Sequence, residues 1–65
     1  MQTQKFDIFS GRYREEDAYW IDAVAGFDEA YQMMLMLAAV KPGPYFIFDS
    51  QEGSCAGKVD TTYVN

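Results

Sequence analysis

The strongest constraint on the fold is one segment of helix-forming residues that is bounded by backbone breakers. Gly26 precedes this segment, and Lys41–Pro44 (KPGP) follows it. From Glu29 to Val40 every residue except one glutamine is apolar, a good helix former, or both. Proline lacks an amide donor and disfavours helical angles in the residue before it, so a helix must end here. We therefore expect one helix over Glu29–Val40, with Asp28 as its N-cap.

Four segments on either side of this helix have the composition or the alternation of β-strands. They are Lys5–Ser10, Ala18–Ala25, Tyr45–Asp49 and Ser54–Val59. Gly53 can supply the positive φ that the turn between the last two requires. The order is ββαββ, which predicts an α+β fold: a four-stranded, mainly antiparallel sheet with one helix packed on one face.

The whole chain, residues 1–65, is expected to form a single small domain, with residues 61–65 either extending the last strand or forming a loose tail. Domains of this size are marginally stable without a disulfide, a metal or oligomerisation. The chain has one cysteine, Cys55, and no histidine. An intrachain disulfide and a cysteine- and histidine-rich zinc site are therefore excluded, and no metal or cofactor is expected. Oligomerisation remains open.

Charge and hydropathy argue against two classes of partner. The net charge is −5, with ten acidic and five basic residues, so nucleic acid is not an expected partner because phosphate contacts supply most of its affinity. The longest apolar run, Met33–Val40, is too short to span a bilayer, so no membrane association is expected. A free thiol and the lack of an export-signal pattern favour the cytoplasm.

The sequence Gly53–Gly57 (GSCAG) has the outline of a nucleophile elbow with cysteine as the nucleophile. A catalytic thiol needs a base, and the chain contains no histidine. We therefore interpret the segment as a strand with a close backbone approach at a glycine. Simple alternation then places Cys55 with Val59 on the shielded face of that strand. Asp7, Asp22 and Asp49 are interpreted as solvated strand charges, so no enzyme activity is expected.

The predicted helix is apolar on more than its core-facing side. Ala30, Met33, Met34, Leu37 and Ala38 form the stripe expected to pack on the sheet. The other side is also largely apolar, which is typical of an interaction surface. We expect a non-enzymatic protein-interaction domain that forms a homodimer through these interface candidates: Tyr31, Gln32, Leu35, Met36, Ala39 and Val40.

An alternative is a domain that binds a small ligand or regulates through one. Its aromatic-lined site would lie between the C-terminus of the helix and the sheet, near the rigid KPGP loop. The candidate ligand contacts are Arg12, Arg14, Trp20 and Tyr45. The alternation of the second strand leaves open which sheet face carries Trp20.

Several motifs resemble a group of very short bacterial proteins of unassigned function, whose sequences read approximately VFSG…DAxWLxxVEGL…RM…AAEKPGxYFVFD. The matching residues here are Phe9-Ser10-Gly11, Asp17-Ala18, Trp20-Ile21, Gly26-Phe27, Met34, Ala38-Ala39 and the run Lys41–Asp49. This resemblance covers residues 6–50 and implies a bacterial cytoplasmic protein, without a known activity. Where the group tends to have charges along the helix, this chain has Met33, Leu35, Met36 and Val40, which favours self-association.

Overall fold

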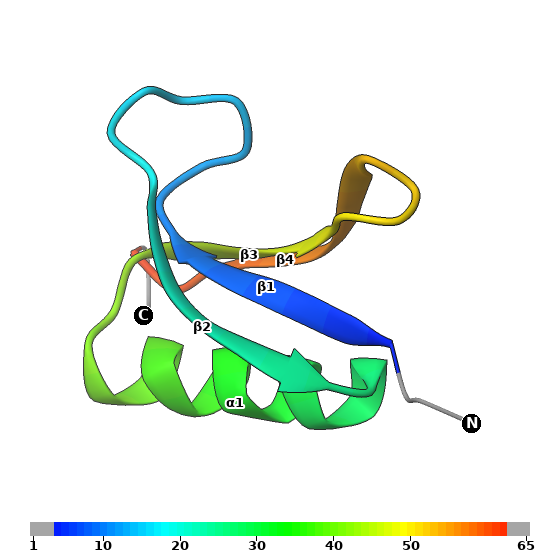
Figure 1. Cartoon of the computed structure of the whole chain (residues 1–65). Coiled ribbons are helices and arrows are strands. Elements are labelled where there is room, and N and C mark those ends of the chain that lie inside the picture. The colour runs from blue at the N-terminus through cyan, green and yellow to red at the C-terminus, as the bar shows by residue number, and fades with distance from the viewer. Residues whose placement is uncertain (1–3, 63–65) are drawn as a thin grey trace.

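In the computed structural model, which describes residues 4–62, a four-stranded antiparallel sheet is covered on one face by a single helix (Figure 1). The elements in chain order are β1 (Lys5–Ser10), β2 (Tyr19–Ala25), α1 (Phe27–Val40), β3 (Pro44–Asp49) and β4 (Ser54–Asp60). The predicted α+β class and the order ββαββ are confirmed.

The strands lie in the order β2-β1-β3-β4, and all neighbours pair antiparallel. β2 and β3 therefore run parallel to each other with β1 between them, and α1 connects them across one face of the sheet. The central pair, β1 and β3, places Ile8 opposite Ile47. Both side chains are fully buried, so the centre of the sheet is also the centre of the core.

The core lies between α1 and the inner face of the sheet. Three residues of α1, each one turn from the next, are buried against it: Ala30, Met34 and Ala38. The two alanines allow the helix backbone to approach the strands closely, while Met34 fills the middle. The sheet contributes the buried residues Phe6, Ile8, Tyr45 and Ile47, and the half-buried Met33 and Leu37 complete the stripe expected from the sequence.

The helix begins earlier than the sequence predicts, so the assignment of Asp28 as N-cap is wrong. The N-cap is Gly26, whose φ of 86° turns the chain into the helix, and no side chain makes a capping hydrogen bond. Asp28 instead lies in the first turn, where its charge still favours the positive end of the helix dipole. This earlier start lets the ring of Phe27 pack edge-on against Phe6, with centroids 5.6 Å apart.

A β-bulge in β2 determines the orientation of Trp20. Ile8 pairs with Asp22 and Phe9 pairs with Trp20, so Ile21 is left without a partner. This shift places Trp20 beside Phe9 on the face of the sheet away from α1. The indole N–H of Trp20 donates a hydrogen bond to Oδ1 of Asp7, 3.2 Å away on the same face. The bulge therefore resolves the orientation that alternation alone leaves open.

β4 also contains a bulge, and the simple alternation predicted for this strand is therefore wrong. Ile47 pairs with Gly57 and Phe48 pairs with Cys55, which leaves Ala56 as the extra residue. Cys55 therefore lies opposite Phe48 and does not continue the row of Gly57 and Val59. Gly57 faces the core, but a Cβ at this position would lie 3.6 Å from the ring of Phe27, an ordinary contact distance, so the close backbone approach expected from the sequence is not found at this glycine.

The outer face of the sheet carries an aromatic cluster of its own. Phe9 and Phe46 stack with centroids 4.8 Å apart, and the ring of Tyr13 meets Phe46 edge-on at 5.5 Å. Tyr13 belongs to the loop between β1 and β2, which rises on the side of the sheet opposite α1 (Figure 1). The rings of Phe9 and Tyr13 pack against Phe46, which is only 5% exposed although α1 lies on the other face of the sheet.

Candidate functional site

The first candidate site is the outer face of α1, which is apolar and exposed. Leu35, Met36 and Val40 are 45%, 68% and 85% exposed. Gln32 and Ala39 are exposed beside them, whereas Tyr31 is half-buried and stacks on Phe27 with centroids 5.8 Å apart. Five of the six interface candidates therefore share one open face, and Tyr31 forms its edge against the core.

Charges are confined to the two ends of this helix. Asp28 and Glu29 are exposed in the first turn, and the exposed Lys41 is the C-cap. No charged residue occurs between Ala30 and Val40. The outer face of α1 is thus an uncharged strip with a negative end and a positive end.

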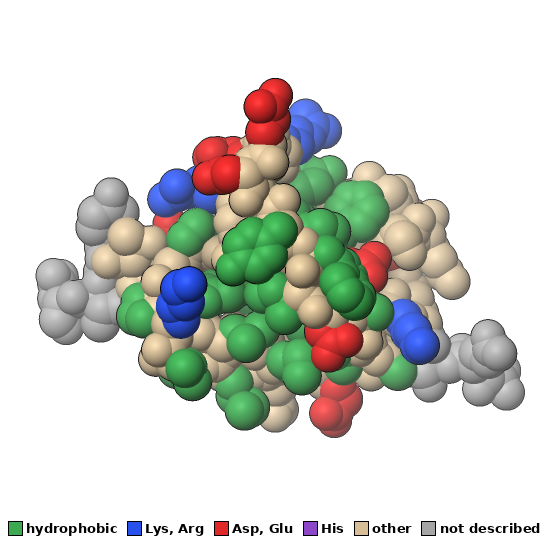
Figure 2. All heavy atoms as spheres, turned by 60° about the vertical axis from the view of Figure 1, so that its left-hand side comes forward, with side chains coloured by type: hydrophobic (Ala, Val, Ile, Leu, Met, Phe, Trp, Pro, Cys, Tyr) green, Lys and Arg blue, Asp and Glu red, His purple; other side chains and the backbone are tan. Residues whose placement is uncertain are grey.

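The second candidate site is a groove of about 560 Å³ at the end of the sheet where the β1–β2 loop folds back. Arg12, Tyr13 and Glu15 come from that loop, Phe46 from β3, and Lys58 with Asp60 from β4, among other lining residues. The backbone amide of Gly11 donates to the carbonyl of Pro44 at 2.8 Å and ties the loop to the start of β3. Figure 2 shows acidic and basic side chains grouped at the top of one face of the molecule, and below them hydrophobic side chains with single charged ones between and beside them.

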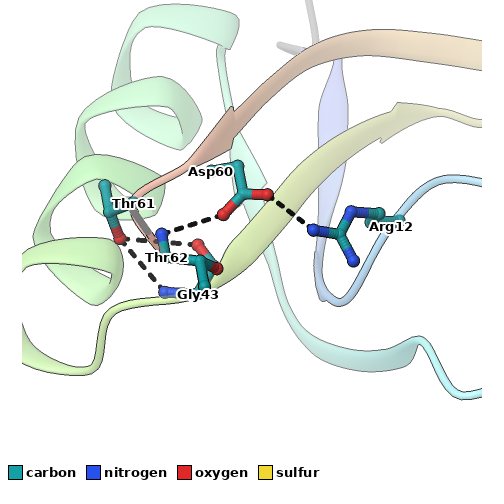
Figure 3. A network of polar contacts seen from close by, with 5 residues as sticks. All are labelled: Arg12, Gly43, Asp60, Thr61 and Thr62. Carbon is teal, nitrogen blue, oxygen red and sulfur yellow. Dashed lines mark hydrogen bonds and ion pairs between the residues drawn. The ribbon is translucent and has the colours of Figure 1, made fainter. Parts of the chain in front are cut away.

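An ion pair links the loop to β4 at one side of the groove. Nη2 of Arg12 lies 2.9 Å from Oδ2 of Asp60, and the amide of Thr62 donates to Oδ1 of the same carboxylate at 2.9 Å (Figure 3). Hydrogen bonds from Thr62, with a further contribution from Arg12, hold the pKa of Asp60 below its usual value. Asp60 therefore stays ionised at neutral pH.

The groove brings together two of the four residues predicted as ligand contacts. Arg12 and Tyr45 both line it. Arg14 and Trp20 lie outside the lining. The guanidinium carbon of Arg14 is 5.4 Å from the ring centroid of Tyr13, and the indole N–H of Trp20 donates to Asp7. The Tyr45 hydroxyl donates to the carbonyl of Lys41 at 2.6 Å, toward the end of the helix.

Sequence reasoning did not identify Tyr13, Phe46, Lys58 or Asp60 as possible site residues. A sequence signal existed for Phe46, because β3 reads Phe-Ile-Phe at its centre and is therefore apolar on both faces. Lys58 reaches the groove because it pairs with Phe46 in the ladder, which the sequence alone does not specify. Tyr13 reaches the groove through the shape of an irregular loop, for which the sequence carries no comparable pattern.

Among residues 4–62, no group of three or more Cys, Asp or Glu side chains is placed to hold a metal ion. Within the same residues, α1 is too short to cross a membrane. Comparisons of the chain with family models, curated proteins and solved structures found no match.

Proposed function

We propose that this protein is a non-enzymatic interaction domain that forms a homodimer through the outer face of α1. The observation that carries this proposal is the uncharged, exposed strip of Leu35, Met36 and Val40. A surface helix of a small domain normally presents polar and charged residues to solvent. A contiguous exposed apolar surface is a common mark of a protein interface.

The other apolar or hydrogen-bonding surfaces of the described residues are less suited to association. Both edge strands, β2 and β4, contain a bulge. Bulges interrupt the ladder and hinder the addition of another strand. The aromatic cluster on the outer sheet face is partly covered by Tyr13. The face of α1 is the one that a second copy can cover without rearrangement.

The charges at the helix ends favour an antiparallel arrangement of two copies. In such a pair, Lys41 of each copy lies near Asp28 and Glu29 of the other, and both contacts occur twice by symmetry. A parallel pair would instead place like charges together. If Lys41 opposes Glu29, the two-fold axis passes near residue 35, the midpoint of the two positions. Leu35 and Met36 then meet their own counterparts at the centre of the interface.

The size of the surface sets the expected affinity. A helix of 14 residues is about 21 Å long and about 10 Å wide. Its contact is smaller than the roughly 800 Å² per partner of a standard stable interface. We therefore expect a reversible dimer that dissociates in the micromolar range or above.

We also propose that the protein is located in the bacterial cytoplasm, because of the resemblance of its motifs and its free thiol, Cys55.

Sedimentation velocity over a concentration series, up to roughly 1 mM, tests the proposal. The wild type should shift from monomer to dimer, and Met36→Lys should stay monomeric with unchanged stability. Tyr19→Lys is the matched control, because Tyr19 is 58% exposed but lies on β2. A wild type that stays monomeric throughout the series, or a control that dissociates as much as Met36→Lys, contradicts the proposal.

A further inference from the structure

The groove beside the β1–β2 loop combines both signs of charge with an aromatic wall. Arg12 and Lys58 contribute positive charge, and Glu15 and Asp60 contribute negative charge. The rings of Tyr13 and Phe46 form the apolar part of the lining. Two cations and two carboxylates within one groove have no net charge, so the lining favours a ligand that itself carries both signs.

Both cations have donors available to a ligand. Lys58 is exposed beside Phe46 and has no ion-pair partner among residues 4–62. Arg12 uses one nitrogen for Asp60, and its side chain is 53% exposed. A guanidinium has five N–H donors, so most of them remain free. An ion pair this exposed adds little to stability, which means that a ligand can share or replace it at low cost.

The two carboxylates restrict which ligands suit the groove. Asp60 is held in its ionised form by Thr62 and lies beside the free donors of Arg12. Ligands with several negative charges, such as polyphosphates, would be repelled by Asp60 and Glu15. Ligands that are purely cationic would be repelled by Lys58 and Arg12. A molecule with one ammonium and one carboxylate can satisfy both sides.

We infer that this groove binds a small amphoteric molecule of the α-amino acid class with an apolar or aromatic side chain. The ligand carboxylate contacts Lys58 and Arg12, and its ammonium contacts Asp60. Its side chain packs against Tyr13 and Phe46. The groove volume of about 560 Å³ lies within the range of about 300–1,000 Å³ that is usual for small-molecule sites.

The test is a titration of the ¹⁵N-labelled protein with three probes, followed by amide chemical shifts. L-phenylalanine carries both charges, 3-phenylpropionate lacks the ammonium, and 2-phenylethylamine lacks the carboxylate. We expect saturable shifts for L-phenylalanine around Gly11 and Lys58, with a dissociation constant in the millimolar range that suits so small a ligand. Each truncated probe should bind about tenfold more weakly or worse, because it loses a charge-assisted contact.

Two exposed substitutions separate recognition from folding. Lys58→Met should weaken L-phenylalanine about tenfold and reduce its advantage over 2-phenylethylamine. Asp60→Asn should reduce the advantage of L-phenylalanine over 3-phenylpropionate, an effect that a purely structural role would not produce. Met36→Lys, on the opposite side of the molecule, should bind as the wild type does.

Three results overturn the inference: shifts that do not saturate by roughly 20 mM L-phenylalanine, equal binding of the three probes, or shifts that map to α1. The site does not depend on dimerisation. The result of the titration is therefore independent of the oligomeric state measured by sedimentation.

Discussion

The side-chain hydroxyl of Thr61 donates a hydrogen bond to the carbonyl of Ala38, 3.0 Å away, and so caps the C-terminus of α1 from the end of the sheet. The amide that would normally reach this carbonyl belongs to residue 42, which is a proline and has no N–H. The Thr61 hydroxyl also accepts a hydrogen bond from the amide of Gly43 at 3.1 Å (Figure 3). One side chain thus satisfies two backbone groups that the helix stop leaves without partners.

Replacing Thr61 should therefore cost more than its partial exposure suggests. Thr61→Val keeps the shape but removes both hydrogen bonds, and we expect a loss of about 1–3 kcal/mol in the free energy of unfolding. Thr61→Ser retains the hydroxyl and should lose well under half of that. Urea denaturation of the three proteins measures the difference. Equal losses for the valine and serine variants would show that the hydroxyl is not the stabilising group.

The antiparallel dimer makes a prediction about charge reversal. Glu29→Lys and Lys41→Glu should each weaken dimerisation by roughly threefold to tenfold at low salt, because each replaces two attractive contacts by two repulsive ones. The double variant, and an equimolar mixture of the two single variants, should recover association. Sedimentation of each sample provides the measurement.

Added salt is the control for this series, since it should reduce the differences among the variants. If the wild type dimerises but the double variant is as weak as the single ones, the antiparallel arrangement is wrong while the interface itself stands. If the wild type does not dimerise at all, the proposed function fails.

Two glycines should respond in opposite ways to the same substitution. Gly11 has a φ of 122°, and a Cβ there would lie 2.7 Å from Cα of Ala18, so Gly11→Ala should destabilise by about 2 kcal/mol or more. Gly57 is extended, and a Cβ would make an ordinary contact with Phe27. Gly57→Ala should be neutral or stabilise by up to about 1 kcal/mol. Thermal unfolding compares the two, and a larger loss at Gly57 would contradict the packing described for β4.

The lowered pKa of Asp60 predicts an acid-dependent part of the stability. A carboxyl group whose pKa is lowered on folding stabilises the protein above its usual pKa near 3.8, and this contribution disappears as the pH falls through the lowered value. Asp60→Asn should therefore be less stable than the wild type at about pH 6, and the gap should close by about pH 2. Urea denaturation at both pH values measures the gap.

Arg12→Met provides a comparison for Asp60. Thr62 contributes the largest part of the lowered pKa of Asp60, so this variant should keep most of the pH dependence. A gap between the wild type and Asp60→Asn that is the same at both pH values would show that the carboxylate is not stabilised on folding.

The sequence identified the elements because their patterns are local. The apolar run ending at the KPGP loop required a helix, and strand-like alternation or composition indicated the four strands. The bulges at Ile21 and Ala56 were not foreseeable, because an alternating pattern assumes one partner per residue. The start of α1 was also missed, since the positive φ of Gly26 replaces the capping role expected of Asp28.

The two candidate surfaces differ in the same respect. The exposed face of α1 follows from the helical period, which places Leu35, Met36 and Val40 away from the core. The groove depends on contacts that are distant along the chain, above all the pairing of Arg12 with Asp60, which are 48 residues apart. It also depends on a loop in which Arg14 adopts a φ of 72°. No short sequence pattern encodes either of these features.

The strand order has a consequence for the rate at which this chain folds. Each outer strand forms a hairpin with its neighbour in sequence, but β1 and β3 join residues such as Ser10 and Tyr45, which are separated by 35 positions (45 − 10). Closing that loop is the costly step, since its entropy is lost before the central contacts form. We expect the transition state for folding to be the docking of two preformed hairpins around α1. Substitutions at Ile8 or Ile47, and substitutions that weaken the β1–β2 or β3–β4 hairpin, should then slow folding, because their contacts are already present in the transition state.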